Sequence, residues 1–512
     1  MLVKTFSSAV YGIKATTITI EVNISSGTQY FIVGLPDSAI KESTFRVESA
    51  LQSAGYRMPR QKIVINMAPA DIKKEGSAYD LGMAIGILAA SGQINGEKLA
   101  DYLILGELSL DGGIQPITGA LPIAIQARQE GFKGIILPAT NAREAAIVDG
   151  LEVYGVDNLL EAILFISGEK DLEQVRVDTR AEFLHNINNY EFDFADVQGQ
   201  ENIKRALEIA AAGGHNVILI GPPGAGKTML AKRLPSILPP LNLHESLETT
   251  KIHSVAGKIA AAGSLMTVRP FRAPHHTVSD VALVGGGGNP QPGEISLAHN
   301  GVLFLDELPE FKRSVLEVLR QPLEDRQITI SRAKLTVDYP ASFMLIASMN
   351  PCPCGFYNHP EKDCVCTPAI VQRYLSKVSG PLLDRIDLHV EVTPVNFEEL
   401  STIQRAEQSE KIRQRVVDAR NIQEERFHDD KFIHSNAQMS SKLVREICQL
   451  SAAGQTLLKN AMERLGLSAR AYDRILKVSR TIADLDNSIT IEMEHLAEAI
   501  HYRSLDREGW AG

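Results

Sequence analysis

The alternation of apolar and polar positions in the first third of the chain predicts an α/β unit. From residue 1 to about 165, strand-like and helix-like runs follow one another and are separated by turn residues. The strand-like runs are TTITIEVNI, QKIVINMAP, YLILGELSL and GIILP, and the helix-like runs are SAYDLGMAIGILAASG and GALPIAIQARQEG. The polar, weakly periodic stretch that follows, residues 168–190, is typical of a linker.

The remainder of the chain divides into a segment with buried strands and a helical segment. The short apolar runs NVILI, VLFL and FMLIASM fall between residues 191 and 395 and predict strands of a parallel sheet. From residue 396 to 512 the pattern is helical, with long runs such as SARAYDRILKVSRTIADL. We therefore predict an α/β multidomain protein, since 512 residues fit about three domains of roughly 150 residues each.

Composition narrows the classes of function. Lys and Arg total 52 and Asp and Glu total 62, which gives a formal net charge of −10. Such a chain is not a bulk polycation that coats nucleic acid, so a DNA contact has to come from a local basic patch. The longest apolar run, LGMAIGILAA, is about half as long as a bilayer-spanning helix. With no secretory core at the start of the chain, we expect a cytoplasmic protein without a membrane partner.

The motif GPPGAGKT predicts a nucleotide-binding phosphate loop. It follows the apolar run NVILI and precedes the helix-like MLAKRL, which is the context that a phosphate loop requires. Its glycines allow backbone N–H groups to turn around an anion, while the lysine offers a charge to the β and γ phosphates and the threonine a ligand to Mg²⁺. The predicted ATP-binding residues are Gly221, Pro222, Pro223, Gly224, Ala225, Gly226, Lys227 and Thr228.

Four further polar residues follow apolar segments downstream of the phosphate loop. Asp306 ends the run GVLFLD and is a candidate Mg²⁺ ligand, and Glu307 is the candidate residue that orients the attacking water. Asn350, after the next strand, can hold that water, although an asparagine there is also a common turn residue. Arg385 in GPLLDRID is a candidate arginine finger that acts on a neighbouring subunit's nucleotide, and the alternative is a surface pair with Asp384.

Four of the five cysteines lie within fifteen residues and predict a metal site. Cys352, Cys354, Cys364 and Cys366 can surround one tetrahedral Zn²⁺, in an insert that spans residues 351–367. The C-x-C spacing is tighter than usual, so His359 remains an alternative ligand, and reduced structural cysteines or a redox pair remain alternatives to a metal. Cys448 stands apart in a helical segment and is predicted to be a core residue.

Taken in order, these motifs resemble those of an AAA+ ATPase followed by a helical lid. The stretch from Pro270 to Phe311 is more specific and resembles the magnesium-chelatase-like group of AAA+ proteins, and within it the ComM/YifB family. The resemblance implies ATP and Mg²⁺ as cofactors and a nucleotide-contacting arginine in the lid. It places that arginine at Arg470, with Arg474 as the second choice because the two share a helix face.

The resemblance also implies a function. It implies a homohexameric ring that translocates on single-stranded or branched DNA and promotes branch migration during recombination in natural transformation. In related ring helicases a hairpin before the Asn strand points into the pore, and here that position holds ITIS and LTVDY around Arg332 and Lys334. A solvated hairpin is the alternative. A second basic cluster comprises Arg269, Arg272, His275 and His276. The alternative function is a chelatase-type motor that remodels a protein partner.

The segment 1–167 resembles the proteolytic domain of Lon proteases, an α+β fold of the ribosomal S5 domain 2-like type. Local alignment puts Ala78 at the serine position and Leu121 at the lysine position of the catalytic dyad, with Ser77 one residue away. A serine nucleophile needs an adjacent amine to accept its proton. Because both residue types are missing, we expect no peptidase activity. A purely structural domain is the alternative.

Overall fold

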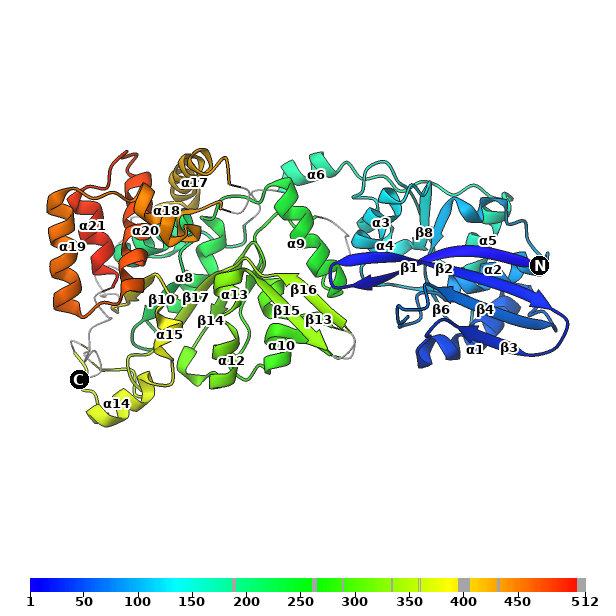
Figure 1. The fold of residues 1–512 in the computed structure, drawn as a ribbon, viewed down its shortest axis with the longest axis horizontal. Coiled ribbons are helices and arrows are strands. Elements are labelled where there is room, and N and C mark those ends of the chain that lie inside the picture. The colour runs from blue at the N-terminus through cyan, green and yellow to red at the C-terminus, as the bar shows by residue number, and fades with distance from the viewer. Residues whose placement is uncertain are drawn as a thin grey trace.

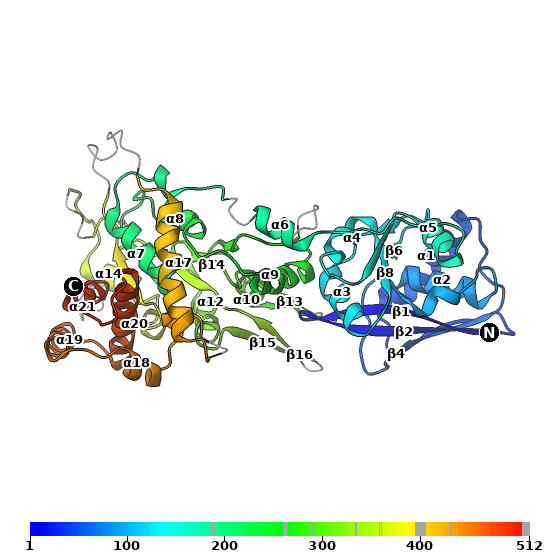
Figure 2. The same cartoon turned by 90° about the horizontal axis from the view of Figure 1, so that it is seen from above.

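The computed structural model describes residues 1–186, 190–259, 265–287, 290–332, 335–357, 359, 361–394, 406–430 and 433–503. The molecule is elongated, with the N-terminal sheet at one end, a second sheet in the middle and the C-terminal helices at the other end (Figures 1 and 2). The domain boundary predicted between residues 395 and 396 lies outside the described residues. No helix in the described part of the chain combines the length and apolarity that a bilayer crossing requires.

The first sheet has seven strands in the order β3-β4-β2-β1-β5-β8-β9. The strands are β1 (Leu2–Tyr11), β2 (Lys14–Ser25), β3 (Tyr30–Val33), β4 (Lys62–Ala68), β5 (Tyr102–Ile104), β8 (Gly134–Pro138) and β9 (Glu152–Val156). Every second residue of β2 from Ile18 to Ile24 is buried, as its alternating pattern requires. Helix α2 (Asp80–Ala90) is buried on all sides because it is apolar on all sides, and it packs on β1, β2 and α1 (Ser38–Ser53).

The second sheet consists of five parallel strands in the order β11-β14-β17-β10-β18. They are β10 (Val217–Ile220), β11 (Phe271–Arg272), β14 (Val302–Leu305), β17 (Met344–Met349) and β18 (Leu388–Glu391). The parallel strands predicted from the apolar runs are therefore confirmed, and nearly all of their residues are buried. Helices α7 (Glu201–Gly213) and α8 (Lys227–Arg233) pack beside this sheet.

The C-terminal part is helical, as predicted. Helix α17 (Ser409–Arg426) packs on α7, and the strongly amphipathic α20 (Ala469–Leu485) packs on α7, α17 and α21 (Met493–His501). The remaining α-helices are α3 (Ala120–Gln129), α4 (Ala139–Ala145), α5 (Leu159–Ser167), α6 (Thr179–Asn186), α9 (Leu243–Val255), α10 (Asp280–Val284), α11 (Glu294–Leu297), α12 (Arg313–Val318), α13 (Pro322–Asp325), α14 (Pro368–Leu375), α15 (Gly380–Leu383), α18 (Ser441–Ile447) and α19 (Ala452–Leu465). Short strand pairs are β6 (Glu107–Leu108) with β7 (Ile114–Gln115) and β12 (Gly285–Gly286) with β13 (Gln291–Pro292).

The predicted hairpin before β17 is present. Strands β15 (Gln327–Arg332) and β16 (Leu335–Pro340) pair antiparallel up to the pair Arg332 and Leu335. Lys334 and the side chain of Arg332, the two predicted DNA contacts, lie outside the described residues. The sequence pattern thus predicted the hairpin correctly, and its contact with DNA stays a prediction.

The N-terminal sheet joins the rest of the molecule through α3 and α9, which pack against each other. The backbone N–H of Gly119 donates to the carbonyl of Ser254 at 3.1 Å, and the Ser254 hydroxyl donates to Glu144. Next to this contact lies a cavity of about 1000 Å³, which Val10, Ser77, Ala78 and Val255 help to line. Because the polar bonds across the contact are buried, the two parts hold a defined orientation.

A buried ionic network fixes the C-terminal helices to the parallel sheet. Asp387, which precedes β18, accepts from Arg474 of α20 at 2.8 Å and from the backbone N–H of Asn216 at 3.0 Å, and it lies 3.4 Å from His215. Burial alone would raise the pKa of the Asp387 carboxyl, but Arg474 and His215 together hold that pKa below its ordinary value. One carboxylate therefore links a sheet strand, the segment before β10 and the lid.

We expect the substitution Asp387→Asn to lower the free energy of unfolding by about 3 kcal/mol, because it leaves buried positive charge without its counter-charge. Urea unfolding followed by circular dichroism measures the change. The matched control is Glu446→Gln, which removes a carboxylate from an exposed pair with Lys442 and should change the free energy by less than about 0.5 kcal/mol. Equal losses in both variants would contradict the assigned role of Asp387.

Candidate nucleotide-binding site

The phosphate loop lies at the carboxyl edge of the parallel sheet, between β10 and α8. Gly224 and Gly226 adopt φ angles of +80° and +83°, a left-handed conformation that glycine adopts without strain. Gly221 packs so closely on the residue after β18 that an added Cβ would lie 2.3 Å from the carbonyl oxygen of Val392. The glycines that predicted the loop are thus required by its backbone and by its neighbour strand.

Lys227 lies at the centre of the predicted site. Its Nζ donates to the carbonyls of Gly221 at 2.6 Å and Pro222 at 2.9 Å, and to Oδ1 of Asn350 at 3.0 Å. Burial lowers the pKa of the Lys227 ammonium, and the nearby Asp306 and Glu307 partly offset that effect. The structure therefore brings Lys227 and Asn350 together, as the order of the motifs predicted.

The two predicted Mg²⁺ ligands are adjacent. The Thr228 hydroxyl donates to Oδ2 of Asp306 at 2.7 Å, and the Ser348 hydroxyl donates to Oδ1 of the same carboxylate. A hydroxyl beside a carboxylate at the end of a buried strand is a donor set that suits Mg²⁺. Sequence reasoning missed Ser348, whose only signal was its place two residues before Asn350.

Glu307 is held in an unusual backbone conformation, with φ of +55°, that turns it away from β14. Its side chain is 57% exposed, and its Oε2 lies 3.4 Å from Nδ1 of His276. The proximity of His276 was not predicted, because His276 was grouped with a basic cluster. Two members of that cluster are neutralised within the chain, since Arg269 pairs with Glu245 at 3.1 Å and Arg272 pairs with Glu294 at 2.6 Å.

The predicted arginine finger and lid arginine lie together at the other edge of the sheet. Arg385 is 7% exposed, donates to the carbonyl of Pro381 at 2.6 Å and contacts Glu324 of α13 at 2.5 Å. Arg470 lies 3.7 Å from Asp384, the residue that precedes Arg385. Arg474, the second choice, contacts Asp387 instead. Arg385 therefore belongs to the segment that leads into β18, and Arg470 of α20 contacts that segment.

The parallel register measures how far these arginines lie from the phosphate loop. Val217 at the start of β10 is opposite Leu388, and Ile220 at its end is opposite Glu391. The phosphate loop follows Ile220, whereas Arg385 precedes Leu388, so the length of the strand lies between them. At a rise of about 3.3 Å per residue, that length is about 13 Å. In this structure, Arg385 and Lys227 thus occupy opposite edges of one sheet.

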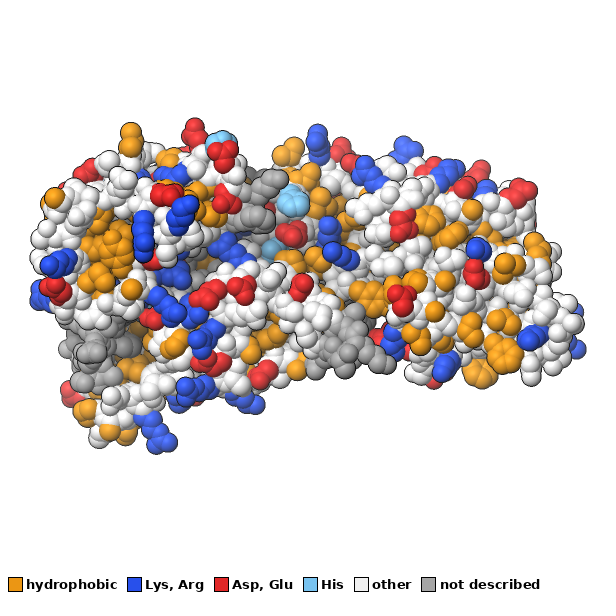
Figure 3. All heavy atoms as spheres, viewed as in Figure 1, with side chains coloured by type: hydrophobic (Ala, Val, Ile, Leu, Met, Phe, Trp, Pro, Cys, Tyr) orange, Lys and Arg blue, Asp and Glu red, His pale blue; other side chains and the backbone are white. Residues whose placement is uncertain are grey.

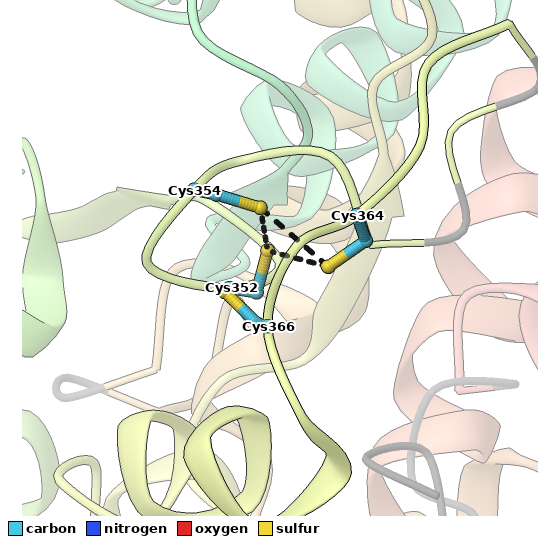
Figure 4. Close-up of side chains that lie close together, drawn as sticks. All are labelled: Cys352, Cys354, Cys364 and Cys366. Atoms are coloured by element: carbon cyan, nitrogen blue, oxygen red, sulfur yellow. Dashed lines mark hydrogen bonds between the residues drawn. The ribbon is translucent and has the colours of Figure 1, made fainter.

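The four clustered cysteines converge on one point (Figure 4). The Sγ atom of Cys352 lies 3.3 Å from that of Cys354 and 3.7 Å from that of Cys364, and all four sulfurs lie within 4.8 Å of one another. Four thiolates around a tetrahedral Zn²⁺ at about 2.3 Å are about 3.8 Å apart, so the donor set and its spacing fit that ion. The alternative ligand His359 is turned away, since its Nδ1 accepts from the backbone N–H groups of Glu361 and Lys362.

The fifth cysteine is a core residue, as predicted, and the positions aligned with a catalytic dyad lie in two different environments. Cys448 is 4% exposed in the core, and burial raises its pKa to about 12. Ala78 and Ser77 line the 1000 Å³ cavity, whereas Leu121 is fully buried and its N–H donates to Glu144 at 2.9 Å. The two positions aligned with the dyad thus hold a methyl group at a cavity wall and an apolar side chain in the core.

The fold and the site together define a class of protein. An AAA+ ATPase core combines a parallel sheet of this strand order with a phosphate loop and with polar residues at two further strand ends. Here the phosphate loop follows β10, Asp306 follows β14 and Asn350 follows β17. The family model "Magnesium chelatase, subunit ChlI" matches residues 193–400, the model "Subunit ChlI of Mg-chelatase" matches 20–141, and the C-terminal ChlI model matches 406–503.

Whole-chain relatives make the assignment more specific. The competence protein ComM of Haemophilus influenzae is 44% identical over 98% of this chain and 97% of its own length. The YifB protein of Escherichia coli is 45% identical over 98% of this chain and 96% of its own length. Lon protease 2 of Bacillus subtilis is 32% identical over 27% of this chain and 26% of its own length. The chain belongs to the ComM/YifB family of magnesium-chelatase-like AAA+ proteins, and membership implies ATPase activity.

We expect Glu307→Gln to lower kcat for ATP hydrolysis by about 10² to 10⁴-fold and to leave nucleotide binding intact, because the amide keeps the shape but cannot accept a proton from water. Phosphate release measures turnover, and a fluorescent ATP analogue measures affinity. Glu310→Gln is the matched control, since it removes a nearby carboxylate that pairs with Lys377. If Glu307→Gln hydrolyses ATP at the parent rate, the assignment of Glu307 is wrong.

Proposed function

We propose that this protein is a cytoplasmic, ATP-driven AAA+ motor that assembles as a homohexameric ring and acts on single-stranded or branched DNA. Its proposed activity is that of a helicase that promotes branch migration during recombination in natural transformation. The name of the relative ComM, a competence protein, supports this role. The observation that carries the ring is the separation of Arg385 and Arg470 from the phosphate loop by the length of a strand.

This separation supports a site completed by a second subunit. Phosphoryl transfer is accelerated by about 10³ to 10⁵-fold when an arginine contacts the transferring group. Arg385 and Arg470 lie at the amino edge, beside Asp384 and Glu324, and Lys227 lies at the carboxyl edge. Head-to-tail contact between identical subunits brings the amino edge of one to the phosphate loop of the next and closes a ring.

The chain's own residues divide the work of hydrolysis. The loop Gly221–Thr228 binds the phosphates through its backbone N–H groups and through Lys227. Thr228 and Asp306 hold Mg²⁺, which when bound neutralises charge on the phosphates. Glu307 and Asn350 orient the attacking water, and Glu307 accepts its proton. Arg385 and Arg470 of a neighbouring subunit complete the site.

The contact with DNA is assigned to the hairpin β15–β16 through Arg332 and Lys334 at its tip. Lys and Arg side chains gather over α20 and α15, and acidic side chains lie over α13 (Figure 3). Burial and the nearby Arg474 lower the pKa of Arg326, which precedes β15, to about 10. Burial and Arg474 also lower the pKa of Lys477 to about 8. Backbone phosphates bind Lys and Arg side chains without readout of the bases, and a chain of net charge −10 can offer such side chains only in local patches.

The alternative is a chelatase-type motor that remodels a protein partner, which the matching chelatase family models favour. The DNA motor is preferred because the whole-chain relative is a competence protein. Stimulation of ATP hydrolysis by single-stranded or branched DNA distinguishes the two, since a chelatase-type motor would respond to its protein partner instead.

Two further assignments belong to the same proposal. Residues 1–167 form a Lon-protease-like domain without a catalytic dyad, and the partial match to Lon protease 2 supports this assignment. The linker 168–190 joins this domain to the ATPase core, residues 191–395, which the lid, residues 396–512, follows. In the core insert 351–367, Cys352, Cys354, Cys364 and Cys366 hold one structural Zn²⁺, which their spacing supports.

Mixing variants tests the shared site. Lys227→Ala and Arg385→Ala should each be inactive alone, yet a mixture should recover ATPase activity. In the mixture, a subunit with Arg385→Ala still has an intact phosphate loop, and a neighbour with Lys227→Ala still supplies an intact Arg385. A mixture of Arg385→Ala with Arg470→Ala should stay inactive if both arginines act on the neighbour. Recovery in that second mixture would show that Arg470 acts within its own subunit. No recovery in the first mixture would contradict the ring.

The double substitution Arg332→Ala/Lys334→Ala should weaken DNA binding by at least about tenfold and reduce the salt dependence of affinity, since two phosphate contacts are lost. Nucleotide binding should be unchanged. Fluorescence anisotropy with a labelled strand at several salt concentrations measures both effects. The control Lys442→Ala/Lys459→Ala removes the same charge from exposed lid positions. Equal DNA affinity and salt slope in both double variants would remove the hairpin hypothesis.

A further inference from the structure

The cysteine cluster is built into the nucleotide site. Cys352 is fully buried and follows Asn350 by two residues, immediately after β17. Asn350 in turn accepts the hydrogen bond from Lys227 at 3.0 Å. A shift of Cys352 by a fraction of a bond length therefore moves a side chain that touches the phosphate-binding lysine.

A second contact runs from the cysteine loop to the phosphate loop itself. Gly355, next to Cys354, has a φ angle of +84° and lies against the ring of Pro223. A Cβ at this position would be 2.5 Å from Cδ and 3.2 Å from Cγ of the proline. The backbone of the cysteine loop thus contacts the phosphate loop at Pro223, while Val392, just after β18, contacts it at Gly221.

The second cysteine pair precedes α14, and this helix contacts Asn350. Cys364 and Cys366 precede this helix, whose Tyr374 is buried beside the backbone of Asn350. Among the described residues between the two cysteine pairs, Gly355 alone is buried, and Glu361, Lys362 and Asp363 are exposed. A loop with so few buried apolar groups needs a cross-link to hold one conformation, and four converging thiolates supply the ligands for a metal cross-link.

We propose that the metal-loaded cysteine cluster is a positioning element for ATP hydrolysis: it fixes Asn350 and, through Gly355, the phosphate loop, so that metal loading sets kcat. This inference rests on the proposed zinc binding and ATPase activity. Displacement of a positioned group by about 1 Å can cost about 10²-fold in rate. The backbone cradle keeps most of its contacts with bound phosphates, so affinity changes less than turnover does.

The sharpest test keeps all four thiolates and changes only the contact with Pro223. We expect Gly355→Ala to retain about one zinc per chain and nucleotide affinity within about threefold, and to lose at least about tenfold in kcat. Gly131→Ala is the matched control, because Gly131 has a φ angle of +82° and no atom within 4 Å of an added Cβ. It has the same backbone strain without the contact and should keep the parent kcat. A zinc-loaded Gly355→Ala enzyme with kcat within twofold of the control overturns the proposal.

Metal removal gives an independent arm. A zinc-selective chelator, followed by stepwise addition of Zn²⁺ at constant Mg²⁺, should lower and then restore kcat in proportion to bound zinc. Amide hydrogen exchange of residues 221–228 should rise on zinc removal, a readout that does not depend on turnover. Cys354→Ser/Cys366→Ser should reproduce the metal-free state, and Cys448→Ala should not.

The possible failures are distinguishable. A parent chain purified without zinc and unable to bind it overturns the metal site and, with it, this inference. A parent chain that binds zinc but hydrolyses no ATP contradicts the proposed function, while hydrogen exchange still reports the coupling. Zinc removal that changes neither hydrogen exchange nor kcat overturns the coupling and leaves both proposals on which it rests intact.

Discussion

The parallel alignment of the five central strands is the constraint on which the rest of the structure depends. Parallel strands present all their carboxyl ends at one edge, so the phosphate loop, Asp306 and Asn350 meet there although more than a hundred residues separate the first from the last. The same alignment sends every amino end to the opposite edge, where Arg385 and the base of the hairpin lie. The candidate nucleotide-binding residues are therefore assembled at one edge, and Arg385 lies nearly buried at the other.

Each edge is stiffened by a different device. At the amino edge, Asp387 gathers Arg474, His215 and the backbone of Asn216 in a buried network, which a hydrophobic contact could not orient as specifically. At the carboxyl edge no such ionic network surrounds the phosphate loop in the described residues. Its support comes from close backbone packing at Gly221 and Gly355 and from the cysteine cluster.

Local sequence motifs were predicted correctly, whereas contacts between distant segments were not. The phosphate loop, the strand ends and the hairpin are local patterns, and the structure has each of them at the predicted residues. Contacts between distant segments were not predictable: His276 with Glu307, Ser348 with Asp306, and Gly355 with Pro223 depend on tertiary packing. The sequence placed Arg269 and Arg272 in a basic cluster. Tertiary packing instead pairs them with Glu245 and Glu294.

One ion pair connects two elements at the amino edge of the sheet, the segment before β18 and helix α13 before the hairpin. Arg385 contacts Glu324 of α13, three residues before β15 begins at Gln327. The guanidinium is nearly buried, whereas the carboxylate is about half exposed, so the pair is shielded mainly on the arginine side. The pair thus joins the segment before β18 to the helix that leads into the hairpin, so a displacement of Arg385 would remove the charge that neutralises Glu324 at the base of the hairpin.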